Sequence, residues 1–247
     1  MKPKPHIVLL PGLDGTGELF EPIVPYLEHE FELSIIAYSN QDSFSELVKN
    51  ARSQLPAKNN ISLVAESFSG PVAISMLAQD DVHFGPSVLC ATFTKSPYKL
   101  LADLARHLPE SVFNHDTINQ IALDLFGINK TTPKDVRNRV LDALKKIGPK
   151  TLKARIKILS ELDVSNEITN IRAPLLYIQA EEDKILSKST VRKQMLGFEN
   201  IHFASVKGPH LLMQTYPEEC AKLIIDHVTS NKRMQTDLVA ASRPLGR

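Results

Sequence analysis

The sequence has few cysteines, almost no net charge and no long apolar run. Its two cysteines, Cys90 and Cys220, match neither a disulfide framework nor a metal-ligand spacing, so we expect buried free thiols and no bound metal. A formal net charge of +1 offers no basic surface for nucleic acid. No apolar stretch approaches the roughly 20 residues of a membrane span, so we expect no membrane insertion.

The first residues also lack the features of a secretory signal. Lysines and prolines begin the chain, and the apolar run that follows ends at Leu10, before Pro11 and Gly12, which is too short for a signal peptide. We therefore expect a cytoplasmic protein. A chain of 247 residues with ordinary hydrophobic content predicts one domain with a large buried core.

Short apolar segments alternate with amphipathic ones along most of the chain, which is typical of parallel strands joined by crossover helices. The six predicted strands are His6–Leu10, Leu33–Tyr38, Ile61–Ala65, Ser87–Ala91, Leu175–Ala180 and His202–Val206. The helices predicted between them are Glu21–Glu28, Ser43–Leu55, Pro71–Gln79, Lys188–Met195 and Pro217–Val228. The expected fold class is α/β, with a mainly parallel sheet of about six strands and flanking helices.

One long interval, residues 95–170, contains helical patterns but no convincing strand. The patterns cover Tyr98–His107, Thr117–Phe126, Lys134–Ile147 and Leu152–Leu162. Because the interval separates the fourth and fifth predicted strands, we expect an inserted helical cap at the sheet edge where ligands bind, with an extension of the core as the alternative. The core then comprises residues 1–94 and 171–229, and the polar residues 230–247 are predicted to form a disordered tail.

The segment A-E-S-F-S-G, residues 65–70, lies between a predicted strand and a predicted helix. A serine at such a sharp turn exposes its Oγ above the sheet, and the next N–H points into an oxyanion hole. Residues two positions away must be small, which Ala65 and Ser69 satisfy, although the usual motif has glycine at both. Ser67 is the candidate nucleophile and the Phe68 N–H a candidate oxyanion donor; a serine that only caps the helix is the alternative.

The segment L-P-G-L-D-G-T-G, residues 10–17, follows the first predicted strand. Its glycines permit backbone conformations that aim N–H groups into a cleft, so we expect the Leu13 N–H to be the second oxyanion donor. The glycine order is neither that of a dinucleotide-binding loop nor that of a phosphate loop, and a plain tight turn is the remaining alternative.

His210 differs from the other histidines in its position, because it lies in a loop between the last predicted strand and the last predicted helix. An imidazole there can reach Ser67 on one side and a carboxylate on the other. Three carboxylates, those of Glu181, Glu182 and Asp183, follow the fifth predicted strand. One of them should orient the histidine, and a solvated acidic loop is the alternative.

From residue 6 to about 228 the sequence resembles the α/β-hydrolase superfamily. The resemblance is carried by L-P-G-L-D-G-T-G, by A-E-S-F-S-G and by G-P-H at residues 208–210, which are similar to motifs of a group of small bacterial hydrolases. The first segment also resembles that of plant plastid esterases and acyltransferases that make phytyl esters. The resemblance implies an α/β-hydrolase fold. It also selects Asp183 as the acid, because a basic and then an apolar residue follow it, as in the acid loop of these enzymes.

The candidates Ser67, Asp183 and His210 follow the chain order of the triad in α/β hydrolases. We therefore expect a serine hydrolase that cleaves a small-molecule carboxylic ester or thioester through an acyl-Ser67 intermediate, without a cofactor or metal. Three alternatives stay open: acyl transfer to an alcohol, carbon–carbon bond hydrolysis of a diketone, and a binding protein with an inert serine.

Overall fold

The computed structural model describes residues 4–58, 60–79, 81–97, 99, 103, 104, 107–114, 123, 128 and 132–241. Its centre is one six-stranded parallel sheet in the order β2-β1-β3-β4-β5-β6. The strands are β1 (His6–Leu10), β2 (Glu32–Ile35), β3 (Ser62–Glu66), β4 (Ser87–Cys90), β5 (Leu175–Ala180) and β6 (Ile201–Val206). The predicted α/β class and its six parallel strands are confirmed.

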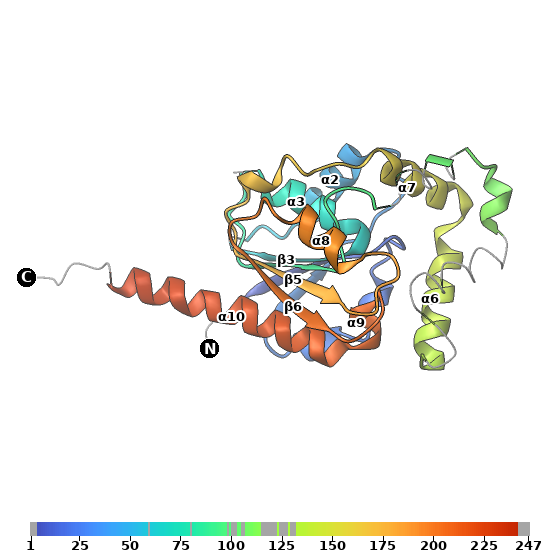
Figure 1. The fold of residues 1–247 in the computed structure, drawn as a ribbon. Helices are drawn as coiled ribbons and strands as arrows, with labels where there is room; N and C mark the ends of the chain where they lie inside the picture. The colour runs from blue at the N-terminus through green and yellow to red at the C-terminus, as the bar shows by residue number, and fades with distance from the viewer. Residues whose placement is uncertain are drawn as a thin grey trace, which may run out of the picture.

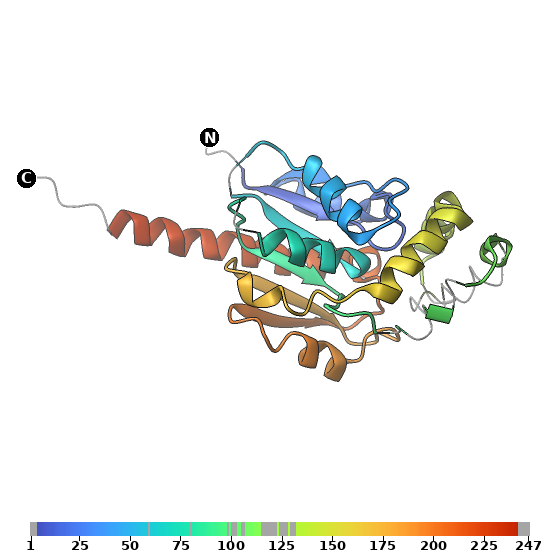
Figure 2. The same ribbon diagram turned by 90° about the horizontal axis from the view of Figure 1, so that it is seen from above.

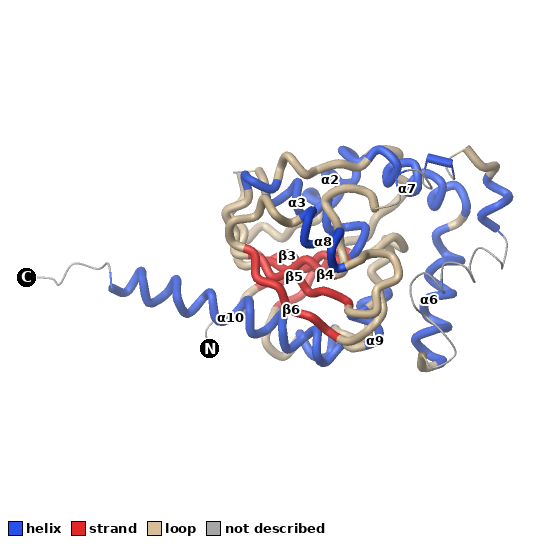
Figure 3. Tube along the Cα trace, in the orientation of Figure 1, coloured by secondary structure: helices blue, strands red, loops and turns tan. Residues whose placement is uncertain are grey.

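Helices lie on both faces of this sheet. The described helices are η1 (Glu18–Phe20), α1 (Val24–Leu27), α2 (Phe44–Ser53), η2 (Ser67–Ser69), α3 (Gly70–Leu77), η3 (Glu110–Asn114), α6 (Lys134–Ile147), α7 (Pro149–Glu161), η4 (Ile168–Asn170), α8 (Lys188–Gln194), α9 (Leu212–Thr215) and α10 (Pro217–Ala241). Helices α2, α3 and α8 cover one face and α10 the other (Figures 1 and 2). Figure 3 shows the strands as a single layer between them.

Burial on both faces explains why the four inner strands, β1, β3, β4 and β5, are mostly apolar instead of alternating regularly with polar residues. In β1, Val8 and Leu10 pack in the cluster under α2 and α3, while Ile7 and Leu9 pack in the cluster with α10. Successive side chains of a strand point to opposite faces, so each face of the sheet receives every second residue. The two apolar layers hold the carboxyl ends of the strands in fixed positions.

Several predicted boundaries differ from the structure, mostly by one to three residues, and those of β2 and α10 are the most informative. Strand β2 ends at Ile35 instead of Tyr38, because the chain leaves the strand and the Tyr38 N–H donates to the carbonyl of Gly15 at 2.8 Å. The backbone of α10 continues past Ser230 to Ala241, where the sequence predicted a disordered tail, and this part of the helix projects beyond the sheet (Figure 1).

No helix in the described part of the chain combines the length and apolar character that crossing a bilayer requires.

The two ends of the segment between β4 and β5 lie side by side, near residues 94–95 and 163–164. Lys95 and Asp163 form an antiparallel bridge and an ion pair of 2.7 Å, and the Val164 N–H donates to the Thr94 carbonyl at 2.9 Å. Helix α6 has the predicted bounds, and α7 begins three residues before the predicted Leu152. The helices predicted at 98–107 and 117–126 fall largely outside the described residues. Helices α6 and α7 stand beyond the carboxyl ends of the strands (Figures 1 and 2).

Candidate active site

Ser67 occupies the sharp turn between β3 and α3. Its φ is +48°, in the left-handed region that side chains rarely adopt, and a strained non-glycine residue of this kind is a recurrent feature of functional sites. The turn is held from both sides: Thr92 Oγ1 donates to the Ser67 carbonyl, and Ser69 Oγ donates to the carbonyl of Pro11. Ser69, which replaces the usual glycine, therefore links the turn to the loop after β1.

The structure brings Ser67, His210 and Asp183 together. His210 Nε2 lies 2.8 Å from Ser67 Oγ, and His210 Nδ1 lies 2.8 Å from Asp183 Oδ2. The side chains of His210 and Asp183 are both 1% exposed, and Ser67 is 8% exposed. The imidazole therefore bridges a hydroxyl and a carboxylate in a site nearly closed to solvent.

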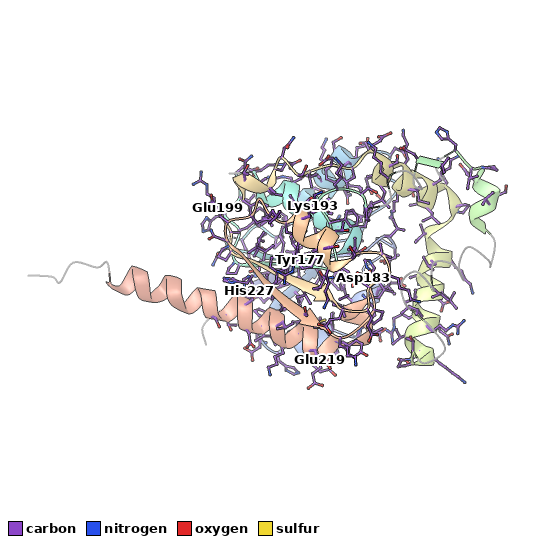
Figure 4. The ribbon with its side chains drawn as sticks, viewed as in Figure 1. Tyr177, Asp183, Lys193, Glu199, Glu219 and His227 are labelled. Carbon is purple, nitrogen blue, oxygen red and sulfur yellow. The ribbon has the colours of Figure 1, made fainter. Side chains whose placement is uncertain are left out.

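Asp183 is the acidic residue of its loop that contacts the imidazole. Its Oδ1 accepts hydrogen bonds from the N–H groups of Ile185 at 2.7 Å and Leu186 at 2.9 Å, which leaves Oδ2 for His210. Glu181 and Glu182 are exposed, and Glu181 pairs with Lys188 at 3.3 Å. Asp183 lies at the end of the sheet nearest α6, whereas Glu199 lies at the opposite end (Figure 4).

The two predicted oxyanion donors lie beside Ser67. Phe68 follows it directly, and a Cβ added to Gly12, the residue before Leu13, would lie 3.9 Å from Ser67 Cβ. Within the described part of the chain, neither the Leu13 nor the Phe68 N–H donates to a protein acceptor. Within the described residues, neither N–H group is used by the fold itself.

A cavity of about 20 Å³ lies over Ser67. Its lining is mostly apolar and consists of Gly12, Leu13, Asp14, Leu19, Ser67, Val140, Leu144 and Leu211. Val140 and Leu144 belong to α6, so the segment between β4 and β5 supplies one wall. A cavity of this size has room for about one water molecule, so the site is closed in this structure.

A larger hollow of about 650 Å³ lies near the amino ends of β5 and β6. Asn170, Arg172 and Glu199 are among the residues that line it, and none of the predicted site residues does.

Glu66, directly before Ser67, is buried and is a feature that the sequence analysis did not single out. Burial raises the pKa of its carboxyl to about 8, and a hydrogen bond of 3.0 Å from Gln214 Nε2 to Oε2 partly opposes this shift. Its Oε1 has no hydrogen-bond partner among the described residues. Glu66 is therefore a neutral acid at pH 7, a state that burial favours because an unpaired charge is costly in an apolar interior.

Arg155 on α7 is a second residue that the sequence analysis missed. It is 3% exposed, and its Nη1 donates to the carbonyls of Leu13 and Asp14, both at 2.6 Å. Burial lowers the pKa of its guanidinium, while the nearby Asp14 carboxylate opposes the shift. The available signal was a single basic residue within the apolar stripe of a predicted helix, alongside Ile158 and Leu162.

The described residues contain no group of three or more His, Cys, Asp or Glu placed to hold a metal ion. The polar groups gathered at Ser67 are instead a hydroxyl, an imidazole, a carboxylate and two free N–H donors. This set can deprotonate a hydroxyl and stabilise an oxyanion.

Comparison with known proteins identifies the fold. No protein-family model and no curated protein matches the sequence. Among solved structures, a hydrolase from Oleispira antarctica is similar with a TM-score of 0.80 at 15% identity over 92% of each chain. An esterase from Exiguobacterium antarcticum has a TM-score of 0.78 at 12% identity over 93% of each chain, and an enol-lactonase from Burkholderia xenovorans 0.75 at 14% over 92% of each. The chain thus has the α/β-hydrolase fold, as the resemblance implied.

Proposed function

We propose that this chain, built on the α/β-hydrolase fold, is a serine hydrolase that cleaves a carboxylic ester or thioester through an acyl-Ser67 intermediate. The observation that carries the proposal is the His210 imidazole, 2.8 Å from Ser67 Oγ on one side and 2.8 Å from Asp183 Oδ2 on the other. The narrower resemblance to plant phytyl-ester enzymes stays a prediction.

The two distances support the following path for the proton. Because Asp183 Oδ2 faces Nδ1, the neutral imidazole carries its proton on Nδ1 and leaves Nε2 free to accept the proton of Ser67. Ser67 Oγ then bonds to the substrate carbonyl carbon while its proton moves to His210 Nε2, and the carboxylate of Asp183 stabilises the imidazolium. The same proton next passes to the leaving group as its bond to carbon breaks.

The N–H groups of Leu13 and Phe68 donate to the carbonyl oxygen as it becomes negative. The loss of one such donor typically costs about 3 kcal/mol of transition-state stabilisation. In the second half of the reaction, water bonds to the acyl carbon while its proton moves to His210. The bond from this carbon to Ser67 Oγ then breaks, His210 returns the proton to Oγ, and the acid is released. No step requires a cofactor or metal.

We place the acyl group of the substrate in the apolar cavity between Ser67 and α6. Residues 95–170 then act as the cap over a core of residues 1–94 and 171–229. Because the cavity of about 20 Å³ is smaller than any ester, side chains of α6 must shift when substrate enters. This assigns substrate choice to the cap and bond cleavage to the core.

Fluorophosphonate labelling combined with an ester assay tests the proposal. We expect the probe to label Ser67 in the folded wild type and p-nitrophenyl esters or acyl-CoA thioesters to be hydrolysed. Ser67→Ala should lose labelling and lower kcat by a factor on the order of 10⁶. Ser75→Ala is the matched control, because Ser75 is buried on α3 and its Oγ has no described hydrogen-bond partner.

Three outcomes would contradict this proposal. A folded wild type that the probe does not label supports a binding protein with an inert serine. Faster ester formation than hydrolysis on addition of a long-chain alcohol supports acyl transfer. Turnover that persists unchanged in Ser67→Ala excludes the acyl-serine mechanism.

A further inference from the structure

Arg155 reaches the loop after β1 from the segment between β4 and β5, as a buried cation that forms no salt bridge with a described residue. Among the described residues, no carboxylate oxygen lies within 4 Å of its guanidinium, and its Nη1 donates instead to the carbonyls of Leu13 and Asp14. A guanidinium loses much of its hydration on burial. Its hydrogen bonds to these two carbonyls therefore replace part of the lost interaction with water.

One of these two carbonyls, that of Asp14, belongs to a continuous chain of hydrogen-bonded peptide groups. The carbonyl of Asp14, which accepts from Arg155, shares its peptide group with the N–H of Gly15. That N–H donates to the carbonyl of Gly12 at 3.1 Å, and the carbonyl of Gly12 shares its peptide group with the N–H of Leu13. Two hydrogen bonds and two peptide groups therefore connect the guanidinium to a proposed oxyanion donor.

The direction of this chain is the same at every step. The described chain has no cis peptide bonds, so the N–H of each peptide points opposite to its carbonyl. The guanidinium donates into the first peptide, the first peptide donates into the second, and the Leu13 N–H is the free donor at the end. Aligned hydrogen bonds of this kind polarise one another, and a cation at the start strengthens the donor at the end.

Other hydrogen bonds of the loop hold this chain of peptide groups in place. The carbonyl of Gly15 accepts from the Tyr38 N–H, and the carbonyl of Pro11 accepts from Ser69 Oγ. Gly15 has a φ of +64°, and a Cβ added there would lie 2.5 Å from Arg155 Nη2. The guanidinium therefore sits directly against the loop, at a position where only glycine leaves room for it.

We infer that Arg155 is a positioning residue of the oxyanion hole, which orients and polarises the Leu13 N–H through the peptide groups of Asp14–Gly15 and Gly12–Leu13. The inference rests on the proposed function, because it assumes that Leu13 faces an oxyanion. It gives the inserted segment a part in the reaction itself: a residue of α7 stabilises charge that develops at Ser67.

The test compares Arg155→Met, which removes the charge and the donors, with Arg155→Lys, which keeps the charge. Arg139→Met is the matched control, because Arg139 is also in the inserted segment but pairs with Glu21 instead of the loop. For each variant, kcat and KM for a p-nitrophenyl ester are measured with the melting temperature. Fluorophosphonate titration counts the folded sites.

Affinity for a trifluoromethyl ketone separates the two possible roles, because a residue with only a structural role would not change this affinity. Ser67 Oγ adds to the ketone carbon, the carbonyl electron pair moves to oxygen, and the serine proton moves to His210, so the adduct carries an oxyanion. Arg155→Met should lower kcat and affinity for this ketone by a similar factor of about 10², with KM within about twofold of wild type. Arg155→Lys should recover part of both losses, and Arg139→Met should change neither.

Two results would overturn the inference. The first is a folded Arg155→Met protein with unchanged kcat and ketone affinity. The second is a loss in which KM and melting temperature change but kcat per titrated site does not, which indicates a structural role alone. If Arg155→Met does not fold, Arg155→Lys decides by the same kcat and ketone comparison. Wild-type protein that the fluorophosphonate fails to label is a separate result, because it removes the proposed function and not only the role of Arg155.

Discussion

The sheet and the inserted helices reach the candidate site by different means. Ser67, Asp183 and His210 come from turns at the carboxyl ends of strands, where backbone hydrogen bonds and two buried apolar layers fix their positions. Helix α6 reaches the same place through the side chains of Val140 and Leu144. Under the proposed function, the groups that make and break bonds lie at the ends of the sheet strands, and the wall that a substrate contacts lies on the segment between β4 and β5.

Helix α6 and the sheet also differ in the contacts that hold each of them in place. Helix α6 is tied to the η1 region by two ion pairs at the surface, Lys146 with Glu18 at 2.7 Å and Arg139 with Glu21. Exposed pairs of this kind typically contribute about 1 kcal/mol or less. A small apolar cluster that includes Leu19, Val140 and Leu211 supplies the remaining contact. The comparison therefore predicts that changes in the core alter the rate for every substrate, while changes in α6 alter the preference among substrates.

Among the variants that test this comparison, the largest effect is expected from Asp183→Asn. The amide cannot hold His210 in the tautomer that accepts the Ser67 proton, so kcat should fall by about 10⁴. If the core supplies the chemistry, the loss is the same for acetate and octanoate p-nitrophenyl esters. Glu182→Gln, a change at the exposed neighbour, should leave kcat unaltered. A loss of kcat that depends strongly on the length of the acyl chain would contradict the proposal that the core supplies the chemistry and the cap the substrate preference.

Glu66→Gln sharpens the comparison on the core side, because it tests the buried neutral acid beneath the turn of Ser67. Between pH 4.5 and about 8 the folded wild type keeps a proton on Glu66 that the unfolded chain has lost. The free energy of unfolding of the wild type should therefore fall, relative to that of Glu66→Gln, as pH rises through this window. The expected change is on the order of a few kcal/mol.

Urea unfolding of both proteins at several pH values measures this difference. Glu30→Gln serves as the control, since Glu30 is exposed and its replacement should leave the pH profile of stability parallel to that of the wild type. Parallel profiles for Glu66→Gln would show that Glu66 is ionised in the folded protein near neutral pH.

The smallest effect is expected from Leu144→Ala, which enlarges the cavity over Ser67 from the side of α6. The ratio of kcat/KM for octanoate to that for acetate p-nitrophenyl esters should rise by about tenfold, while kcat on acetate stays close to the wild-type value. Leu141→Ala is the control, because Leu141 packs partly buried on the same helix without lining the cavity. A ratio that does not change would remove α6 from substrate choice.

Much of the fold could be predicted because strands and helices carry local patterns. Apolar runs marked all six strands, and α6 has the bounds that its periodicity predicted. The end of β2 could not be predicted, since Tyr38 continues the apolar run and a hydrogen bond to Gly15, on a distant loop, takes it out of the strand. The extension of α10 past Ser230 was also missed, because its polar residues lack sustained periodicity.

Local patterns also named the candidate nucleophile and histidine, because a serine at a strand-to-helix turn and a histidine after the last strand are recognisable in sequence. Among Glu181, Glu182 and Asp183, however, local sequence makes no distinction, and the N–H groups of Ile185 and Leu186 decide which carboxylate faces His210. Resemblance had pointed to the same residue.

The sequence by itself determined the parallel sheet, the order of its elements and the turn that presents Ser67, since each depends on neighbouring residues and on backbone geometry. Tertiary structure alone decided which side chains meet there: Arg155 against the Leu13 loop, Val140 and Leu144 over Ser67, and Glu66 in a buried neutral state. The physical reason is that burial, charge state and contact depend on packing between segments far apart in the chain, which no local pattern encodes.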